Sequence, residues 1–522
     1  MSSPARGNSD KGPKRFAPAA PNLVDVARLS ALDASFLRVE TPNAHMHVGW
    51  LSTLELPADV RALDVDALTE RIEARLHLAP RFRQRVTPAP LGLGESLWSD
   101  DPDFDLRRHV ISLSGEEPLG ATMLQRVADA FFSEQLDRRH PLWSILAVPN
   151  LGAGRAAVLG KVHHAMVDGL AAVELGMVLF DLSADAELPP PVLWSPEPGP
   201  TSLRTVIESV ADVGLEQFRA AGRAAALGVS PRRTLRVAET MRRAALSFAG
   251  DALRPAPPSY LNVPIGPRRT VAAHRMPIRR LLALKERCDV KLNDVVLAIA
   301  AGALRRIAMR CGQQPLDLRV MVPVSVRSAD DASAAGNRIT FAFIDLPVAN
   351  ADPLARLRLI RSQTLELKQS GRIEGSDLLL RSVALMPELL KERAARLAAS
   401  PRLYNLTVSN VPGPRVPLYA GGARVASIYP IIPIPERHAL SLGVLSYDGH
   451  VHFSAYADPQ ALPELTPISM LLEDSLVELE LATRPPPATA SLRGGRHGGG
   501  RRVTQRRTRM EPSLLPIRGG AN

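Results

Sequence analysis

Two adjacent histidines, His163 and His164, are followed by Asp168 and Gly169 in the stretch "GKVHHAMVDGLAAVEL" (160–175). An imidazole with an ordinary pKa near ~6.5 can accept a proton at neutral pH, so a positioned histidine is a candidate general base. If a helix begins here, His164 and Asp168 lie on one face, because residues four apart are neighbours on a helix. Gly169 would let the backbone approach another group closely. The spacing therefore favours proton transfer by His164, with a carboxylate that orients the region.

Two other interpretations of the histidine pair stay open, a metal site and a buried structural pair. A metal site needs at least three ligands, and neighbouring residues on a strand point to opposite faces. His163 and His164 are therefore badly placed to bind one ion, and the chain has no H-E-x-x-H or Cys/His grouping. We expect no metal. A buried pair satisfied by hydrogen bonds would fit the local pattern without any chemistry.

Nucleotide and serine-hydrolase motifs do not account for the chain. It contains no P-loop and no G-x-S-x-G elbow. The glycines at 152 and 154 loosely match a dinucleotide fingerprint, but that motif must open a helix and here a β-like apolar run follows. We expect no bound cofactor.

Composition predicts a globular protein of more than one core. The chain has 522 residues, of which 45% are hydrophobic and 22% charged; this length suggests two or three domains. Two cysteines, Cys288 and Cys311, exclude a disulfide framework and favour a cytoplasmic setting. No signal-peptide pattern and no apolar window of about 18 residues is present.

The positive charge is concentrated at the two ends of the sequence. Residues 1–20 carry a net +3 and residues 484–522 a net +8, which together equal the whole chain's +11. The near-neutral remainder argues against nucleic acid as a partner. The tails can be solubilising segments, or they can contact anionic lipid.

Periodicity predicts a mixed α/β protein. Strands are expected at 45–56, 142–151, 155–165, 318–327 and 438–458, the last with a hairpin turn at Asp448-Gly449. Amphipathic or buried helices are expected at 66–78 and 292–310. We predict five parts: a basic tail at 1–25, an N-terminal domain at 26–190, a Pro-rich and Arg-rich helical connector at 191–265, a C-terminal domain at 266–482 and an Arg/Gly-rich tail at 483–522.

Several stretches together resemble one known family. They are "LSALDASFLRVETPNAHMHVG" (29–49), "PRFRQRV" (80–86), "LDRRHPLW" (136–143), "HHAMVDG" (163–169), "LNDVVLA" (292–298), "VPVSVR" (322–327), "GNR" (336–338), "SNVPGP" (409–414) and "YPIIPI" (429–434). The H-H-x-x-x-D-G stretch resembles the motif of the CoA-dependent acyltransferase superfamily. Over about residues 29–480, the chain resembles the bacterial wax ester synthase/diacylglycerol acyltransferases. The resemblance implies two chloramphenicol-acetyltransferase-like domains with an active-site channel between them.

The resemblance also implies roles for the motif residues. His164 matches the general base that deprotonates an acceptor hydroxyl, and His163 a supporting position. Asp168 matches an aspartate that pairs with an arginine and holds the loop, next to Gly169 of the motif. Asn293 is a candidate donor to the oxyanion, with a plain helix N-cap as the competing interpretation.

The remaining site predictions concern the binding of CoA and the association with a membrane. Ser325 and Arg327 are candidates for the CoA or tunnel wall, against an ordinary strand-end role. The basic tail and connector arginines (Arg219, Arg223, Arg232 and Arg233) are candidates for peripheral association with a membrane or lipid droplet. A solvated helix face is the competing interpretation for those arginines.

The function implied is acyl-CoA-dependent esterification of a lipid hydroxyl, with acyl-CoA as co-substrate and no acyl-enzyme. Diacylglycerol giving triacylglycerol is the expected acceptor, and a long-chain alcohol giving wax ester is the variant. Two alternatives remain: a stand-alone condensation or polyketide-associated enzyme with a carrier-bound donor, and a non-catalytic lipid-surface protein.

Overall fold

The computed structural model describes residues 28–88, 96–113, 117–166, 176, 178–190, 192–197, 254–325, 339–370, 388–465 and 467–484. Five of the predictions above fall outside these ranges: Asp168, Gly169, Arg327, the GNR stretch and the four connector arginines. The two basic tails also lie outside them, apart from residues 483 and 484. The described residues up to Thr483 belong to one compact unit.

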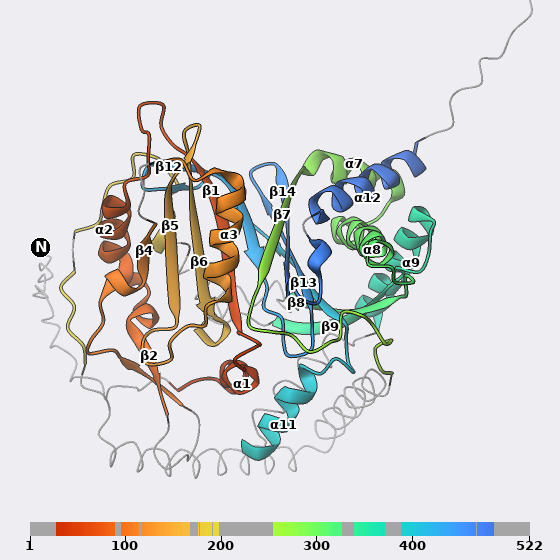
Figure 1. Ribbon diagram of the computed structural model, residues 1–522, viewed down its shortest axis with the longest axis horizontal. Helices are drawn as coiled ribbons and strands as arrows, with labels where there is room; N and C mark the ends of the chain where they lie inside the picture. The colour runs from red at the N-terminus through yellow and green to blue at the C-terminus, as the bar shows by residue number, and fades with distance from the viewer. Residues whose placement is uncertain are drawn as a thin grey trace, which may run out of the picture. The chain divides into compact units, whose positions relative to one another are not determined.

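A first six-stranded sheet has the order β11-β12-β1-β6-β5-β4 (Figure 1). Its strands are β1 (His47–Glu55), β4 (Val110–Ser112), β5 (Trp143–Gly152), β6 (Arg155–His163), β11 (Tyr419–Ala420) and β12 (Ala423–Ile431). Strands β5 and β6 form the expected hairpin, and the turn residues Ala153 and Gly154 have φ values of 52° and 65°. Both values are positive, as a two-residue type I′ turn requires.

A second six-stranded sheet has the order β7-β14-β13-β10-β8-β9. Its strands are β7 (Thr270–Pro277), β8 (Leu318–Ser325), β9 (Ile339–Leu346), β10 (Leu406–Pro412), β13 (Leu440–Tyr447) and β14 (His450–Ala457). A separate small ribbon pairs β2 (Gln84–Thr87) with β3 (Leu97–Asp100). The β13–β14 hairpin turns at Asp448-Gly449, as the sequence predicts.

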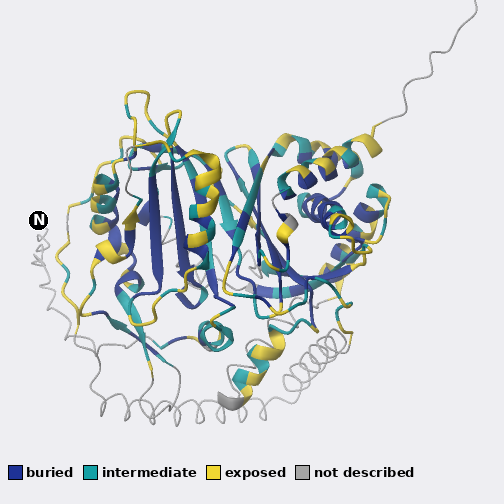
Figure 2. Ribbon diagram, viewed as in Figure 1, coloured by how far each residue is buried: buried dark blue, intermediate teal, exposed yellow. Residues whose placement is uncertain are grey.

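Helices cover both sheets. They are α1 (Ala31–Val39), α2 (Val65–Arg75), α3 (Gly120–Ser133), α7 (Ile278–Cys288), α8 (Leu292–Arg310), α9 (Pro353–Gln369), α11 (Glu388–Ala398) and α12 (Ile468–Ala482). Helix α3 packs against both β5 and β7, so it lies between the two sheets, while α8, α9 and α12 pack on one another beside the second sheet. The central strands are largely buried and the outer helix faces are exposed (Figure 2). The mixed α/β prediction is confirmed.

The two sheets do not follow the division expected from the sequence. Strands β11 and β12 come from the predicted C-terminal part (266–482), yet they complete the first sheet, where β12 pairs antiparallel with β1 from Gly49↔Ile431 to Glu55↔Arg424. A boundary at residue 266 therefore does not separate one sheet from the other. The strand that pairs with β1 comes from a distant part of the sequence, so local periodicity could not reveal this exchange.

Gly443 lies where the exchanged strand β12 meets the second sheet. A Cβ on Gly443 would stand 2.5 Å from the carbonyl oxygen of Pro430 in β12 and 2.6 Å from Oγ of Ser454. That Oγ donates a hydrogen bond to the same Pro430 oxygen. The backbone of β12 cannot move aside as a flexible side chain can, so this close contact requires glycine at position 443.

Gly443→Ala is therefore expected to lower the free energy of unfolding by about 1–3 kcal/mol, the usual cost of overpacking. Denaturant titration of the two proteins measures the difference. Gly176→Ala is the matched control, because a Cβ there meets no atom of the described residues within 4 Å. Equal stability of the Gly443 and Gly176 variants would contradict the close packing of β12 on β13.

Candidate active site

His164 occupies the first position after a central strand. β6 ends at His163, and a single 3-10 turn (His164–Met166) follows. The backbone N–H of His164 donates to the Met46 carbonyl at 2.7 Å, and that of His163 donates to the Leu142 carbonyl at 2.9 Å. The histidine pair is thus fixed by main-chain bonds at the end of the sheet.

The His164 ring lies against an aromatic side chain of α1. It stacks on Phe36 with 3.8 Å between ring centroids and 16° between planes. Its Nδ1 is buried and has no hydrogen-bond partner among the described residues. Burial lowers the pKa of His164 to about 4, with a smaller contribution from the neighbouring His163, although a backbone hydrogen bond opposes this shift. The imidazole is therefore neutral at pH 7 and has one nitrogen able to accept a proton.

His163 points away from this stack, toward a buried carboxylate. Its Nδ1 accepts the backbone N–H of Ala165 at 3.1 Å, which assigns the ring proton to Nε2. That Nε2 faces Oε1 of Glu40 at 3.6 Å, a separation too long for a hydrogen bond and so an electrostatic contact. The two histidines do different things, as expected for neighbours that face different ways.

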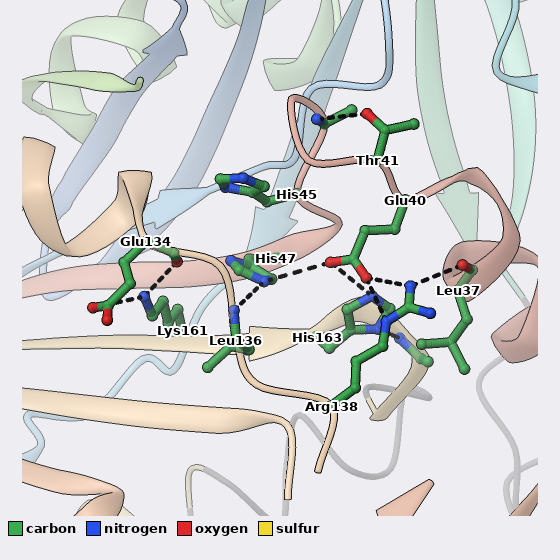
Figure 3. A network of polar contacts seen from close by, with 12 residues as sticks. Leu37, Glu40, Thr41, His45, His47, Glu134, Leu136, Arg138, Lys161 and His163 are labelled. Carbon is green, nitrogen blue, oxygen red and sulfur yellow. Dashed lines mark hydrogen bonds and ion pairs between the residues drawn. The ribbon is translucent and has the colours of Figure 1, made fainter. Parts of the chain in front are cut away.

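Glu40 is the centre of the polar network shown in Figure 3. Its side chain is only 2% exposed. Arg138 reaches it with Nε at 2.8 Å from Oε2 and also donates to the Leu37 carbonyl at 2.9 Å. Burial alone would raise the pKa of Glu40, but the contact with His163 and the Arg138 charge outweigh it and lower the pKa to about 2. Glu40 is therefore ionised at neutral pH.

His47 lies directly across the β1–β6 pairing from His163. Its Nε2 accepts the backbone N–H of Leu136 at 3.4 Å and lies 3.8 Å from Oε1 of Glu40. Burial is the main cause that lowers the pKa of His47 well below its usual value. His47 is therefore a neutral acceptor that attaches the 134–142 loop to the network.

Lys161, two residues before His163, is buried under the end of α3. Its Nζ donates to the carbonyls of Phe131 and Glu134, each at 2.7 Å, and lies 4.5 Å from the centre of the Phe131 ring. Burial lowers the pKa of Lys161 to about 8. The ammonium satisfies carbonyls at the helix C-terminus, where a cation is favoured. This fixes the start of the loop that carries Arg138.

Asn293 lies in the second half of the chain and its contact differs from the expected cap. It is the second residue of α8; the N-cap is Lys291, whose N–H donates to Asp294 at 2.9 Å. Asn293 Oδ1 instead accepts from Asn410 Nδ2 of β10 at 3.0 Å. The N-cap interpretation of Asn293 is therefore wrong, and its own Nδ2 is left to donate elsewhere. Ser325 ends β8 and pairs with Ile339.

Sequence reasoning missed Glu40, Arg138 and Lys161 as members of the site. All three lie in stretches that carried the family resemblance or directly precede its motif, but their charges are not arranged at any local spacing. Arg138 and Glu40 are 98 residues apart. A separate pocket of about 290 Å³ lies between α8 and the start of β8, lined by Tyr260, Leu304, Leu316 and Leu318 among others; it contains none of the residues discussed above.

Neither a metal cluster nor a membrane-spanning helix is found in the part of the chain that the structure describes. No group of three or more His, Cys, Asp or Glu residues there could hold a metal ion. No helix there is long and apolar enough to cross a bilayer.

Comparison with known protein families gives two matches along the chain. A sequence model of the wax ester synthase/diacylglycerol acyltransferase catalytic domain matches residues 29–296. A model of the WS/DGAT C-terminal domain matches residues 335–480. Two Mycobacterium tuberculosis proteins, each described as a probable diacylglycerol O-acyltransferase, are 32% and 33% identical over 460 and 455 residues. Each alignment covers 86% of this chain, and 95% and 98% of the respective relatives.

Solved structures give the same result. The wax ester synthase/diacylglycerol acyltransferase from Marinobacter aquaeolei VT8 superposes with a TM-score of 0.62 at 26% identity, covering 88% of this chain and all of the other. A starter condensation domain of rhizomide synthetase superposes with a TM-score of 0.55 at 16% identity, covering 88% and 96% of the two chains, which shows a shared fold.

The two-sheet fold and the matched catalytic domain define an acyltransferase with the chloramphenicol-acetyltransferase-like architecture. His163 and His164 lie within that catalytic domain. The chain belongs to the wax ester synthase/diacylglycerol acyltransferase family. The resemblance found in the sequence is confirmed.

Proposed function

We propose that this protein transfers the acyl group of an acyl-CoA to the free hydroxyl of diacylglycerol, giving triacylglycerol and CoA. A long-chain alcohol, giving a wax ester, is the variant acceptor. The observation that supports the proposal most directly is the neutral His164 ring, held at the end of β6 by the Met46 carbonyl and the Phe36 stack. The names of the mycobacterial relatives support the choice of acceptor.

His164 acts as the general base in this proposal. It takes the proton of the acceptor hydroxyl as the oxygen attacks the thioester carbonyl carbon, and the carbonyl becomes a tetrahedral oxyanion. The C–S bond then breaks, the carbonyl re-forms as an ester, and the imidazolium returns the proton to the CoA thiolate. The proton balance closes without an acyl-enzyme, so no nucleophilic serine or cysteine is required.

Asn293 is the proposed donor to the oxyanion. Its Oδ1 is occupied by Asn410, so the carboxamide is oriented with Nδ2 as its available donor. A fixed donor of this kind stabilises developing charge without reorganisation. Ser325, at the end of β8, and Arg327 are proposed to line the CoA side of the channel between the two halves.

The Glu40 network supports His164 indirectly, through His163 and helix α1. Glu40 contacts His163, and Arg138 attaches Glu40 to α1, the helix that supplies Phe36. His163 and Glu40 are therefore positioning residues for His164. Asp168 and Gly169 are proposed to hold the loop that follows, the role that their motif positions imply.

We also propose that the protein works at a lipid surface on the cytoplasmic side, with the basic connector and tail in contact with anionic lipid. Both substrates carry long acyl chains, and diacylglycerol is found in membranes. Liposome flotation with and without residues 484–522, and with the four connector arginines neutralised, tests the electrostatic part.

The function is tested by CoA release. Purified protein is incubated with palmitoyl-CoA and either dioleoylglycerol or hexadecanol, thiol release is followed, and the lipid product is identified. We expect acceptor-dependent release with triacylglycerol as the main product. Release with hexadecanol alone would reassign the acceptor to alcohols, and no release with either would favour a carrier-bound donor or a non-catalytic lipid-surface protein.

A further inference from the structure

Helix α11 turns leucines toward solvent. Leu390 is 46% exposed and Leu397 49%. They are seven residues apart and so lie on one side of the helix, with the exposed Arg393 between them. Glu392 and Ala395, on the opposite side, are half-buried. The apolar side of this helix thus faces outward, the reverse of what packing on a protein core produces.

Helix α1 connects this exposed side to the candidate base. α1 packs against α11 and also against the turn that begins at His164 (Figure 1). Leu32 of α1 is 40% exposed, and it lies one turn from Phe36, on the same face of the helix. Phe36 stacks on the His164 ring. An apolar stripe therefore runs from exposed leucine to the imidazole.

Exposed cations accompany the leucines. Arg393 and Arg396 are both exposed, and Arg396 pairs with Glu392 at 2.7 Å along the helix. Leucines with flanking arginines are the composition of helices that lie in the headgroup region, because the long arginine stems reach the charged layer while the leucines enter the apolar one. Three leucines are too few for a stable protein interface, which needs roughly 1,000 Å² or more.

We propose that this leucine face, defined as Leu32, Leu390 and Leu397 with Arg393 and Arg396, is the surface by which the enzyme docks on a phospholipid bilayer. Docking there would place α1 between the bilayer and His164, so a lipid acceptor would enter along α1. The docking locates the contact with a lipid surface that the proposed function includes, and the entry route rests on the proposed acyl transfer.

Vesicle binding of the full chain tests the docking. The variant carries Leu390→Glu and Leu397→Glu, and the matched control carries Leu359→Glu and Leu365→Glu on α9, whose leucines are 45% and 41% exposed. Phosphatidylcholine vesicles remove the attraction of the basic tail for anionic lipid, so the apolar contribution is measured alone. We expect the α11 variant to bind at least about tenfold more weakly and the α9 control to bind as wild type.

Three results would overturn the docking proposal. They are absence of wild-type binding to phosphatidylcholine, unchanged binding of the α11 variant, and an equal loss in both double variants. Equal thermal melting midpoints of the three proteins would show that folding is intact, as expected for substitutions at exposed helix positions. Adding phosphatidylglycerol should strengthen binding, and Arg393→Gln with Arg396→Gln should reduce that gain.

CoA release tests the entry route. Dioleoylglycerol in vesicles is compared with hexanol in solution, each with palmitoyl-CoA. The α11 variant should lose activity on the vesicle acceptor in proportion to its binding, and retain its rate with hexanol. Unchanged activity on vesicles despite weaker binding would overturn entry along α1. Absence of CoA release by the wild-type protein would refute the proposed function but leave the binding result intact.

Discussion

A His164→Ala variant is expected to release CoA about a thousandfold more slowly than the wild-type protein in the presence of palmitoyl-CoA and dioleoylglycerol. This is within the range that general-base catalysis contributes. Binding of acyl-CoA should change little, because the ring is proposed to act on the acceptor hydroxyl. The measurement is kcat and KM from thiol release, together with acyl-CoA binding by calorimetry.

The pH profile supplies a second readout of the same residue. Because the pKa of His164 is lowered to about 4, the base is unprotonated at neutral pH. Wild-type kcat/KM should therefore stay flat as pH falls from 7 and should decline only as pH approaches 4. His77→Ala, at a 3-10 turn after α2, is the control. A His164→Ala rate within about tenfold of wild type would remove this histidine as the base.

A Glu40→Gln variant should lose both stability and activity. In the unfolded chain the carboxyl has an ordinary pKa of 4.5, and the fold lowers it to about 2. That difference is worth about 3 kcal/mol of folding free energy at pH 7. Because the folded pKa is the lower one, this stability is present above about 4.5 and is lost as pH falls toward 2. The gap between wild type and variant in denaturant titrations should close over the same interval.

Activity separates a positioning role from a purely structural one. Glu40 does not touch the reacting atoms. Replacing it with glutamine should lower kcat about tenfold, because His163 loses its charged partner, and should leave KM for acyl-CoA unchanged. Glu134→Gln is the matched control, since its carboxylate is 76% exposed and lies 4.0 Å from Lys161. Unchanged stability and kcat in Glu40→Gln would show that the buried ion pair with Arg138 supports neither folding nor the base.

The local sequence pattern predicts those helices and hairpins whose signals lie within a few neighbouring residues. Helix α8 has the bounds 292–310 that its apolar run predicts, and the β5–β6 and β13–β14 hairpins turn at the predicted residues. These signals need only a few neighbouring residues: a run of apolar side chains, or a turn containing glycine. The spacing of the histidine pair makes His164 a candidate base, but its role as the base is implied by the family resemblance and stays a prediction.

Contacts between residues far apart in the sequence could not be predicted from local pattern. Glu40 meets Arg138 and Asn293 meets Asn410 across 98 and 117 residues. No periodicity connects such partners, because each depends on the completed tertiary structure. The β12 exchange has the same cause. The N-cap interpretation of Asn293 failed for a different reason: α8 begins at Leu292, so Asn293 already lies inside the helix and the N-cap is Lys291.

The exchange of β12 has a consequence for how the protein is made. The matched catalytic domain ends at residue 296, but β1, the neighbour of the strand that carries His163, has one edge covered only by β12. Thr53 meets Ser427 there across 374 residues. During synthesis on a ribosome that edge stays unpaired until the chain beyond residue 431 has emerged. A fragment ending near 296 would expose a template for strand addition and would associate with its own copies. The part of the chain that carries the histidine pair thus depends on β12, near the end of the chain, to stay soluble while the protein is being synthesised.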